Sequence, residues 1–216
     1  VGESGCGKST IAGILAAKNR GYNGEIIIGG VPLNEVNEIN LMQRVVLVRH
    51  NSYLFKGTVE ENLKMAKPDA TKEEMEAVLQ KVNLLGFLQT QDGLQTQLLE
   101  KASNLSGGQC QRLVIARALL RTDSAVYIFD EAASNIDVES EELIMNVIHE
   151  LAKTKTVLLI SHRLANVVKS DKIYFLKDGE IKEIGKHDEL MSRNGAYRHL
   201  YESQMALENY GKGGVA

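Results

Sequence analysis

The sequence has few cysteines, only short apolar runs and no surplus of either charge, and each of these absences excludes a class of protein. Two cysteines in 216 residues, Cys6 and Cys110, argue against a disulfide framework and favour a reducing compartment. Neither has a second ligand at metal spacing, which argues against a structural metal site. The 25 basic and 28 acidic residues nearly cancel, so nucleic acid is not an expected partner.

The longest apolar runs, such as residues 45–48 and 157–160, are far shorter than the roughly 18 residues that a membrane helix needs. Any membrane-spanning partner is therefore expected to lie outside this sequence. No signal peptide is visible, although the chain begins without Met and its sequence gives no information about any residues that precede it. The length suits one large domain, or a domain with a subdomain, around a substantial core.

What the sequence does contain is a glycine-rich opening, VGESGCGKST, with the pattern GxxxxGK[ST] on Gly2, Gly7, Lys8 and Ser9. In this pattern backbone N–H groups wrap phosphates, the lysine reaches the β/γ oxygens and the hydroxyl holds Mg²⁺. The alternative is a glycine-rich turn before an ordinary helix. Four fixed residue types at this spacing rarely coincide by chance, so the phosphate loop is the stronger interpretation.

A helix is expected directly after the loop, because Ile11, Ile14 and Leu15 recur at helical spacing and predict one apolar face. Its N-terminus would point at the phosphates, where free N–H groups and the helix dipole favour anions. Only Val1 represents the strand that should precede the loop. We therefore expect the chain to be a fragment cut where its nucleotide site begins.

Strand and helix patterns alternate along most of the chain, which favours an α/β fold with a mainly parallel sheet. The Asp178-Gly179 pair predicts a tight hairpin into residues 180–184. Thr71 and Glu74 form a capping box for a helix that Gly86 is expected to end. The predicted strands are residues 25–28, 44–48, 125–129, 156–161 and 172–176; the other predicted helices are residues 139–153, 188–192 and 196–207, before a frayed tail at residues 211–216.

Two acids, Asp130 and Glu131, end the apolar run 125–129. Ligands of open α/β sheets gather outside the carboxyl ends of the strands, where the glycine loop is also expected. An Asp there can hold the Mg²⁺ shell, and a neighbouring carboxylate can orient or deprotonate an attacking water. The alternative is a strand that ends in a solvated acidic turn.

A second glycine cluster is formed by Leu105, Ser106, Gly107, Gly108 and Gln109. Ser106 and Gln109 could be no more than a capping box. Two glycines in a first helical turn nevertheless cost about 1 kcal/mol each relative to Ala, and make sense where something approaches the backbone closely. A serine-capped helix N-terminus suits a phosphate, although the spacing alone does not identify the molecule that carries this phosphate.

Together these segments resemble the ATP-binding cassette, the nucleotide-binding domain of membrane transporters. GESGCGKST resembles its Walker A loop, LSGGQ its signature and IFDEA its Walker B motif. Residues 134–137, SNID, stand where the family has its D-loop, and LISH at residues 159–162 carries its switch histidine. The five motifs cover nearly the whole chain in the family's order. The resemblance implies a P-loop NTPase core of residues 1–54 and 122–216, RecA-like, with an inserted helical subdomain at residues 55–121.

The resemblance also implies ATP and Mg²⁺ as cofactors and a head-to-tail pair of domains, in which the Ser106 helix of one covers the γ-phosphate held by Lys8 of the other. Glu131 would act on the water and His162 on the γ-phosphate, whereas a lone histidine after a strand is by itself more often structural. Ser9 and Asp130 would hold Mg²⁺, and Asp137 belongs to the D-loop. The implied nucleotide-binding residues are Gly2, Glu3, Ser4, Gly5, Cys6, Gly7, Lys8, Ser9 and Thr10.

Finer features are similar to the exporter branch of this family. Residues 53–63 resemble the exporter segment that meets the coupling helices of the membrane domain. Residues 96–102, TQLLEKA, keep Thr96 and Glu100 of the exporter pattern TxVGERG and lose both glycines. The segment GKHDELMSRNGAYRHLYESQ is also exporter-like. The implied partners are a transmembrane domain, fused or separate, and a second nucleotide-binding domain, at the cytoplasmic face of the cell membrane.

Two departures from the family pattern affect these expectations. His50 stands where the Q-loop glutamine is expected, and neutral imidazole is a poor ligand for Mg²⁺, which prefers oxygen. This puts the coupling of ATP to transport in question more than nucleotide binding. The aromatic residue that the family places against adenine has no counterpart in this chain.

Three functions remain open at this point: a transporter ATPase, a soluble cassette ATPase that acts on other machinery, and a catalytically weak partner or fragment that only binds nucleotide. Soluble cassettes usually carry a long coiled coil or a second cassette, and neither is visible here. His50 favours the weak partner, whereas Lys8, Ser106 and Glu131 oppose it. The transporter ATPase, of exporter type, is the leading hypothesis.

Overall fold

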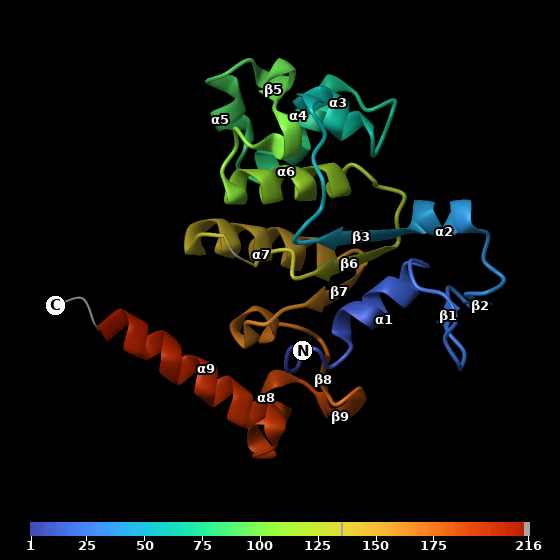
Figure 1. Ribbon diagram of the computed structural model, residues 1–216, viewed down its shortest axis with the longest axis vertical. Helices are drawn as coiled ribbons and strands as arrows, with labels where there is room; N and C mark the ends of the chain where they lie inside the picture. The colour runs from blue at the N-terminus through green and yellow to red at the C-terminus, as the bar shows by residue number, and fades with distance from the viewer. Residues whose placement is uncertain (135, 214–216) are drawn as a thin grey trace. The chain divides into compact units, whose positions relative to one another are not determined.

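The computed structural model describes residues 1–134 and 136–213, with the side chains of 208–213 left out, and divides into two compact units (Figure 1). The first unit comprises Val1–Ala12 and Leu159–Ala216, and the second comprises Gly13–Leu158. The chain passes between them inside the helix α1 (Lys8–Leu15) and inside the strand β7 (Thr156–Ile160).

The second unit is built on a parallel strand pair, β3 (Val45–Arg49) and β6 (Val126–Asp130), with β7 next in the strand order. The register runs from Val45 opposite Val126 to Arg49 opposite Asp130. The last four residues of β6 are all buried, as expected for a parallel strand covered on both faces. The predicted strands at residues 44–48 and 125–129 are thus confirmed, each displaced by one residue.

Helices pack around this pair. The helix α6 (Gly107–Leu119) contacts both β3 and the helix α7 (Val138–Ala152), and Figure 1 shows the two helices running near the strands. The predicted helix at residues 139–153 is confirmed as α7. The short helix α2 (Glu38–Arg44) leads directly into β3, capped by Asn37, whose side chain accepts a hydrogen bond from Ile39 N.

The segment between β3 and α6 is mainly helical, as predicted. It contains α3 (Val59–Lys64), α4 (Lys72–Lys81), α5 (Leu85–Gln89), the two-residue strands β4 (Gly57–Thr58) and β5 (Gln97–Leu98), and 3₁₀ turns at Gly93–Gln95 and Glu100–Ala102.

The prediction that Gly86 ends the helix begun at Thr71 is wrong. The capping box of Thr71 and Glu74 is present, but α4 ends at Lys81 and Gly86 lies inside α5. The chain reverses at Asn83, which has a φ of 52°, while Asn83 N donates to Gln80 O and Leu84 N donates to Leu79 O. This is a Schellman ending in which asparagine, tolerated in the left-handed region, replaces the usual glycine.

The predicted strand at residues 25–28 is shorter than expected. Only Ile27–Ile28 (β1) pairs, antiparallel to Val31–Pro32 (β2). Gly29 and Gly30, with φ of 60° and 84°, form the tight turn between them. Two positive φ values in a two-residue loop are typical of a type I′ hairpin.

The first unit contains a 3₁₀ turn (Leu164–Val167), the hairpin β8 (Ile173–Lys177) and β9 (Glu180–Gly185), and the helices α8 (His187–Ser192) and α9 (Ala196–Gly213). The predicted hairpin turn is confirmed, with Asp178 and Gly179 at φ of 53° and 78°. The helix α9 continues beyond the predicted end at residue 207. The hydrophobic core of the first unit is formed by buried residues from several elements: Val1, Leu164, Val167, Ile173, Phe175, Leu190 and Tyr197.

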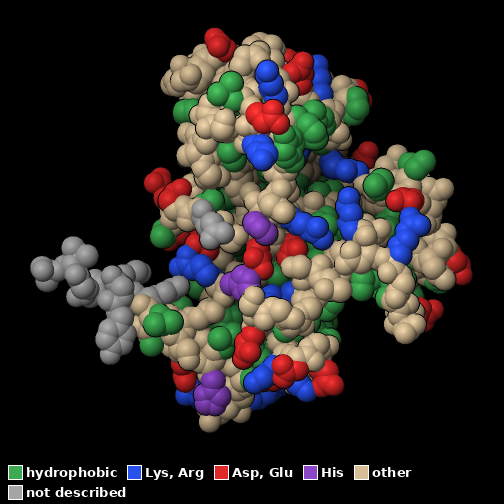
Figure 2. All heavy atoms as spheres, viewed as in Figure 1, with side chains coloured by type: hydrophobic (Ala, Val, Ile, Leu, Met, Phe, Trp, Pro, Cys, Tyr) green, Lys and Arg blue, Asp and Glu red, His purple; other side chains and the backbone are tan. Residues whose placement is uncertain are grey.

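Among the described residues, no helix combines the length and the apolar character needed to span a bilayer. Acidic and basic side chains are interspersed on the face seen in Figure 2.

Candidate nucleotide-binding and catalytic site

The glycine-rich loop is anchored to the sheet of the first unit. Val1 O accepts a hydrogen bond of 2.9 Å from Leu176 N, and Gly2 forms a parallel bridge with Leu176. Gly2 has a φ of 141°, and a Cβ added there would lie 2.0 Å from Leu176 O. Glycine is therefore required at position 2 by the close approach of β8.

The loop then turns through Gly5 and Gly7, whose φ values of 81° and 101° suit glycine, and delivers Lys8 as the first residue of α1. Lys8 is buried, and its Nζ donates to Gly2 O at 2.9 Å and to Glu3 O at 2.8 Å. The ammonium group thus lies over the loop itself. In this position it holds the backbone of the loop together through Gly2 and Glu3.

The helix after the loop does not bury the face that the sequence predicts. Ile11 is 41% exposed, whereas Ala12 is completely buried. Ile14 and Leu15 are half-buried. The periodicity correctly predicts the helix, but its buried face passes through the small residue Ala12, which hydrophobic spacing gives little weight. Ser9 and Thr10 lie exposed in the first turn.

In the second unit, the carboxyl ends of β3 and β6 carry three of the predicted site residues, His50, Asp130 and Glu131, together with Arg49. His50 N donates to Asp130 O at 3.2 Å, so the hydrogen bonding between the two strands continues one residue beyond the end of β3. Arg49 Nε lies 3.6 Å from Asp130 Oδ2. Asp130 is buried, Glu131 is half-buried and His50 is exposed. Sequence reasoning missed Arg49, although its place before His50 at the end of a buried strand was visible.

Glu131 has a strained backbone, with a φ of 56°. Its carbonyl accepts hydrogen bonds from Ser134 N at 3.1 Å and from Ser134 Oγ at 2.8 Å, which hold the turn. A non-glycine residue in the left-handed region costs about 1–3 kcal/mol and persists where the surroundings impose it, often at functional sites. The strained backbone therefore marks Glu131, at the end of β6, as a candidate functional residue.

The oxygen donors fit Mg²⁺. The hydroxyl of Ser9 and the carboxylate of Asp130 are hard ligands of the type this ion prefers. Among the described residues, no group of three or more His, Cys, Asp or Glu side chains could form a metal cage. Mg²⁺ bound with a nucleotide usually takes its remaining ligands from phosphate oxygens and water.

The second glycine cluster forms the N-terminus of α6, with the predicted capping box. Gln109 N donates to Ser106 Oγ at 3.2 Å, and Ser106 N donates to Gln109 Oε1 at 2.9 Å. Ser106 and Gly107 are exposed, while Leu105 and Gln109 are half-buried. Because the Ser106 hydroxyl accepts in this box, its own hydrogen can still be donated to a phosphate.

The two glycines of the cluster have different surroundings. A Cβ on Gly107 would meet nothing within 4 Å, whereas a Cβ on Gly108 would lie 2.6 Å from Ser140 Oγ and 2.9 Å from Asp137 Oδ2. Gly107 thus leaves space for a ligand. Gly108 allows α6 to approach the first turn of α7.

We expect Gly108→Ala to lower the free energy of unfolding by about 1–3 kcal/mol, because the added methyl overpacks the contact with Ser140. Gly107→Ala is the matched control, and should be neutral or stabilising by up to about 1 kcal/mol through helix propensity. Thermal and urea unfolding of the two variants would measure the difference. Equal stabilities would contradict the assignment of Gly108 to packing.

Asp137 is the N-cap of α7. Its Oδ1 accepts a 2.8 Å hydrogen bond from Ser140 N, and the pKa of Asp137 lies below its ordinary value mainly because of hydrogen bonds from Ser140, with a further contribution from Arg112. Arg112 Nε in turn donates to Gly108 O. The predicted D-loop residue is therefore linked to the glycine cluster within one chain. Residue 135 of this loop lies outside the described residues.

His162 lies exposed in the first unit, directly after β7. Its backbone carbonyl accepts a 2.7 Å hydrogen bond from Gln204 Nε2, and Gln204 Oε1 accepts one of 2.9 Å from Leu164 N. One amide of α9 thus holds the backbone on both sides of residue 163. Sequence reasoning missed Gln204, because nothing in the sequence pairs residues 42 positions apart.

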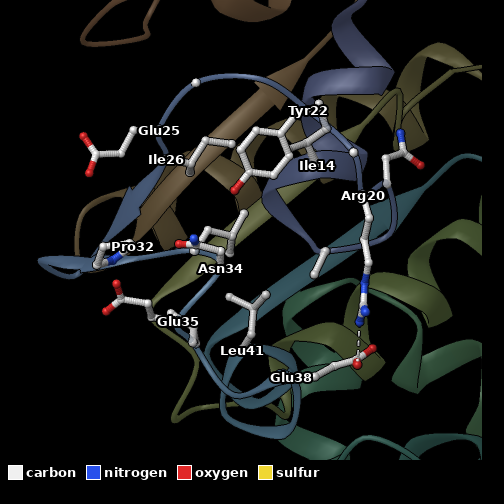
Figure 3. A pocket seen from close by; sticks show the side chains of 16 residues that line it. Ile14, Arg20, Tyr22, Glu25, Ile26, Pro32, Asn34, Glu35, Glu38 and Leu41 are labelled. Carbon is white, nitrogen blue, oxygen red and sulfur yellow. Dashed lines mark hydrogen bonds and ion pairs between the residues drawn. The ribbon is translucent and has the colours of Figure 1, made fainter.

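The second unit also contains a hollow of about 700 Å³ (Figure 3). Ile14, Tyr22, Ile26 and Leu41 line it, and Arg20 forms a 2.8 Å ion pair with Glu38 at its edge. None of the predicted site residues lines this hollow. The predicted residues instead form two sets, with the glycine loop and His162 in the first unit and the strand ends, glycine cluster and Asp137 in the second.

Comparison with known proteins agrees with this motif set. The model of the family described as ABC transporter matches residues 1–134. An uncharacterized ABC transporter ATP-binding protein of Haemophilus influenzae is 50% identical over 208 residues, which are 96% of this chain and 37% of the relative. ATP-dependent lipid A-core flippases of Vibrio vulnificus and Mannheimia succiniciproducens are 41% and 42% identical over 206 residues, covering 94% of this chain and 35% of theirs.

Among solved structures, a bacterial Atm1-family ABC exporter with ATP bound matches with a TM-score of 0.88 at 32% identity, over 94% of this chain and 36% of that one. The match confirms the predicted α/β fold of P-loop NTPase type. The chain spans 35 to 37% of the length of the curated relatives named above.

Proposed function

The chain belongs to the ABC transporter family, and from this premise we propose that it is the ATP-hydrolysing domain that powers a membrane exporter. The observation that carries the proposal is the pair of phosphate-adapted helix N-termini on one chain. Lys8 opens α1 after the glycine loop, and Ser106 caps α6 beside the unobstructed Gly107. Two copies arranged head to tail would place the Ser106 end of one over the nucleotide held by the other.

Nucleotide binding would begin with Lys8. Its ammonium group, now shared between two loop carbonyls, would turn to the β/γ oxygens of ATP while N–H groups of the loop surround the phosphates. Ser9 and Asp130 would hold Mg²⁺, which supplies charge neutralisation on the phosphate oxygens. We also propose the domain division given by the sequence, a core of residues 1–54 and 122–216 with a helical insert at residues 55–121.

Hydrolysis would then depend on Glu131, which would orient and deprotonate the attacking water. His162 would donate to the γ-phosphate, and Gln204 would fix the backbone that carries this histidine. Asp137, beside Gly108, would transmit the state of one glycine cluster to the loop that follows Glu131. Hydrolysis would release the two copies from each other and reset the cycle.

An aromatic pair offers a surface for the membrane partner. Tyr53 and Phe55 are exposed, with ring centroids 4.8 Å apart in an edge-to-face arrangement. Their backbone is held by Arg117, which donates to Tyr53 O, and by the buried Asn62, which hydrogen-bonds Phe55 N and Phe55 O. Rigidly held exposed aromatics are typical of interaction sites. We therefore propose that this segment contacts a transmembrane domain, at the cytoplasmic face of the cell membrane.

The head-to-tail arrangement can be tested by ATP retention in the full-length protein. In a Glu131→Gln background, Ser106→Glu should abolish retention of labelled ATP after gel filtration, because a carboxylate would repel the γ-phosphate of the other copy. Initial binding of a fluorescent ATP analogue should change by less than about twofold, since Ser106 does not serve the ATP of its own chain. Undiminished retention would contradict the arrangement.

A further inference from the structure

One basic side chain lies against the proposed Mg²⁺ ligand. The parallel register sets Arg49, the last residue of β3, directly opposite Asp130, the last residue of β6. Arg49 Nε is 3.6 Å from Asp130 Oδ2, which is ion-pair distance but longer than a hydrogen bond. Within the described part of the chain, this buried Nε donates no hydrogen bond. The contact is therefore electrostatic, without a hydrogen bond from Nε to fix it.

The side chains of Arg49 and Asp130 differ in solvent exposure. The Asp130 side chain is 6% exposed and is carried by a central strand, whereas the Arg49 side chain is 38% exposed. The backbone beneath Arg49 is fixed, because Arg49 N donates to Ser52 Oγ and His50 N donates to Asp130 O. The Arg49 side chain is therefore the partner with access to solvent, on a backbone that is held in place.

A buried carboxylate is costly without a positive charge beside it. Mg²⁺ would supply that charge when the nucleotide is bound, and Arg49 supplies it in this structure. The two cations compete, because like charges a few ångströms apart around one carboxylate repel each other. We propose that Arg49 is a resident counter-cation of Asp130 that the Mg²⁺ of Mg-ATP must displace, so that Arg49 weakens metal binding at this site. The inference rests on the proposed function, since it requires Asp130 to serve the metal.

The inference is specific to the charge and position of Arg49. A purely structural ion pair would contribute to stability and leave metal affinity unchanged. Arg44, just before the opposite end of the same strand, offers a matched control. It donates from Nη1 to Asp123 O and lies five residues from Arg49, roughly 16 Å along an extended strand.

The test is a titration of Mn²⁺, a paramagnetic substitute for Mg²⁺, into the full-length protein with a non-hydrolysable ATP analogue, followed by electron paramagnetic resonance. Arg49→Gln should lower the dissociation constant of Mn²⁺ by about three- to tenfold, the range expected for a partly exposed charge pair. Arg49→Met, which keeps the apolar stem, should do the same. Arg49→Lys, which keeps the charge, and Arg44→Gln should stay within about twofold of the wild type.

Equal Mn²⁺ affinities in wild type and in both charge-removing variants would overturn the inference. A Lys variant that behaves like Gln would also overturn it, because the charge would then not be the cause. Circular dichroism and melting temperatures verify that the compared proteins are folded, and two different charge-removing variants guard against one that is not. Absence of nucleotide-dependent Mn²⁺ binding in every protein, wild type included, would instead overturn the proposed function and the inference with it.

Discussion

Replacing Glu131 by Gln is expected to lower steady-state ATP hydrolysis by about 10²- to 10⁴-fold, the usual contribution of a positioned general base. Gln keeps the size and the acceptor oxygen of the side chain but cannot take a proton from water. ATP should therefore still bind, and in the full-length protein should remain trapped between two copies. Phosphate release and retained labelled ATP measure the two effects.

The surroundings of Glu131 allow this substitution to test the catalytic role of the carboxylate without changing the backbone. Gln accepts the same φ of 56° at the same strain, and the hydrogen bonds from Ser134 go to the backbone carbonyl. Glu139→Gln is the matched control, because Glu139 is exposed in the first turn of α7 and should leave turnover within about twofold of the wild type. Normal hydrolysis by Glu131→Gln would remove this residue from the mechanism.

Replacing Lys8 by Met is expected to weaken ATP binding by at least about tenfold, which corresponds to a loss of about 1.4 kcal/mol or more. The variant loses the charge that would meet the β/γ oxygens. It also loses the two hydrogen bonds from Nζ to Gly2 O and Glu3 O, so the loop should be less ordered before the nucleotide arrives. Titration with a fluorescent ATP analogue measures the affinity.

Lys18→Met provides the comparison for Lys8→Met. Lys18 is exposed just after α1. Its backbone N–H donates to Gly13 O, a hydrogen bond that a change of side chain leaves in place. Its replacement should leave the affinity within about twofold, since a surface charge away from the phosphates contributes little. Equal affinities in wild type and Lys8→Met would show that the loop binds nucleotide through its backbone alone.

Much of the fold follows from local patterns. The buried strands β3 and β6 are recognisable as continuous apolar runs, since parallel strands covered on both faces need no alternation. The Asp178-Gly179 turn and the caps at Thr71 and Ser106 depend on neighbouring residues only, and their chemistry is legible in the sequence. The glycine loop is local in part: Gly5, Gly7 and Lys8 are recognisable from their spacing, whereas the need for glycine at position 2 comes from the distant Leu176.

What the sequence conceals depends on contacts between distant segments. Arg49 faces Asp130 only because two strands 81 positions apart pair in one register, which no local pattern specifies. Gly108 resembles Gly107 until α7 is placed against it. The end of α4 at Lys81 was missed for a different reason: the left-handed residue after it is Asn83, asparagine takes this conformation less often than glycine, and Gly86 was the more conspicuous signal.

Gln204 links the helix α9 to the loop that carries His162, for which we propose a role in hydrolysis. Both of its hydrogen bonds end on the backbone around residue 163, beside the apolar contacts of Leu164 and Val167 with Tyr197 of α9. Unwinding α9 from its C-terminal end as far as Gln204 would release this backbone and leave Tyr197 in place, which is buried in the same cluster as Val1. With the role proposed for His162, such a protein would still bind ATP and would hydrolyse it more slowly.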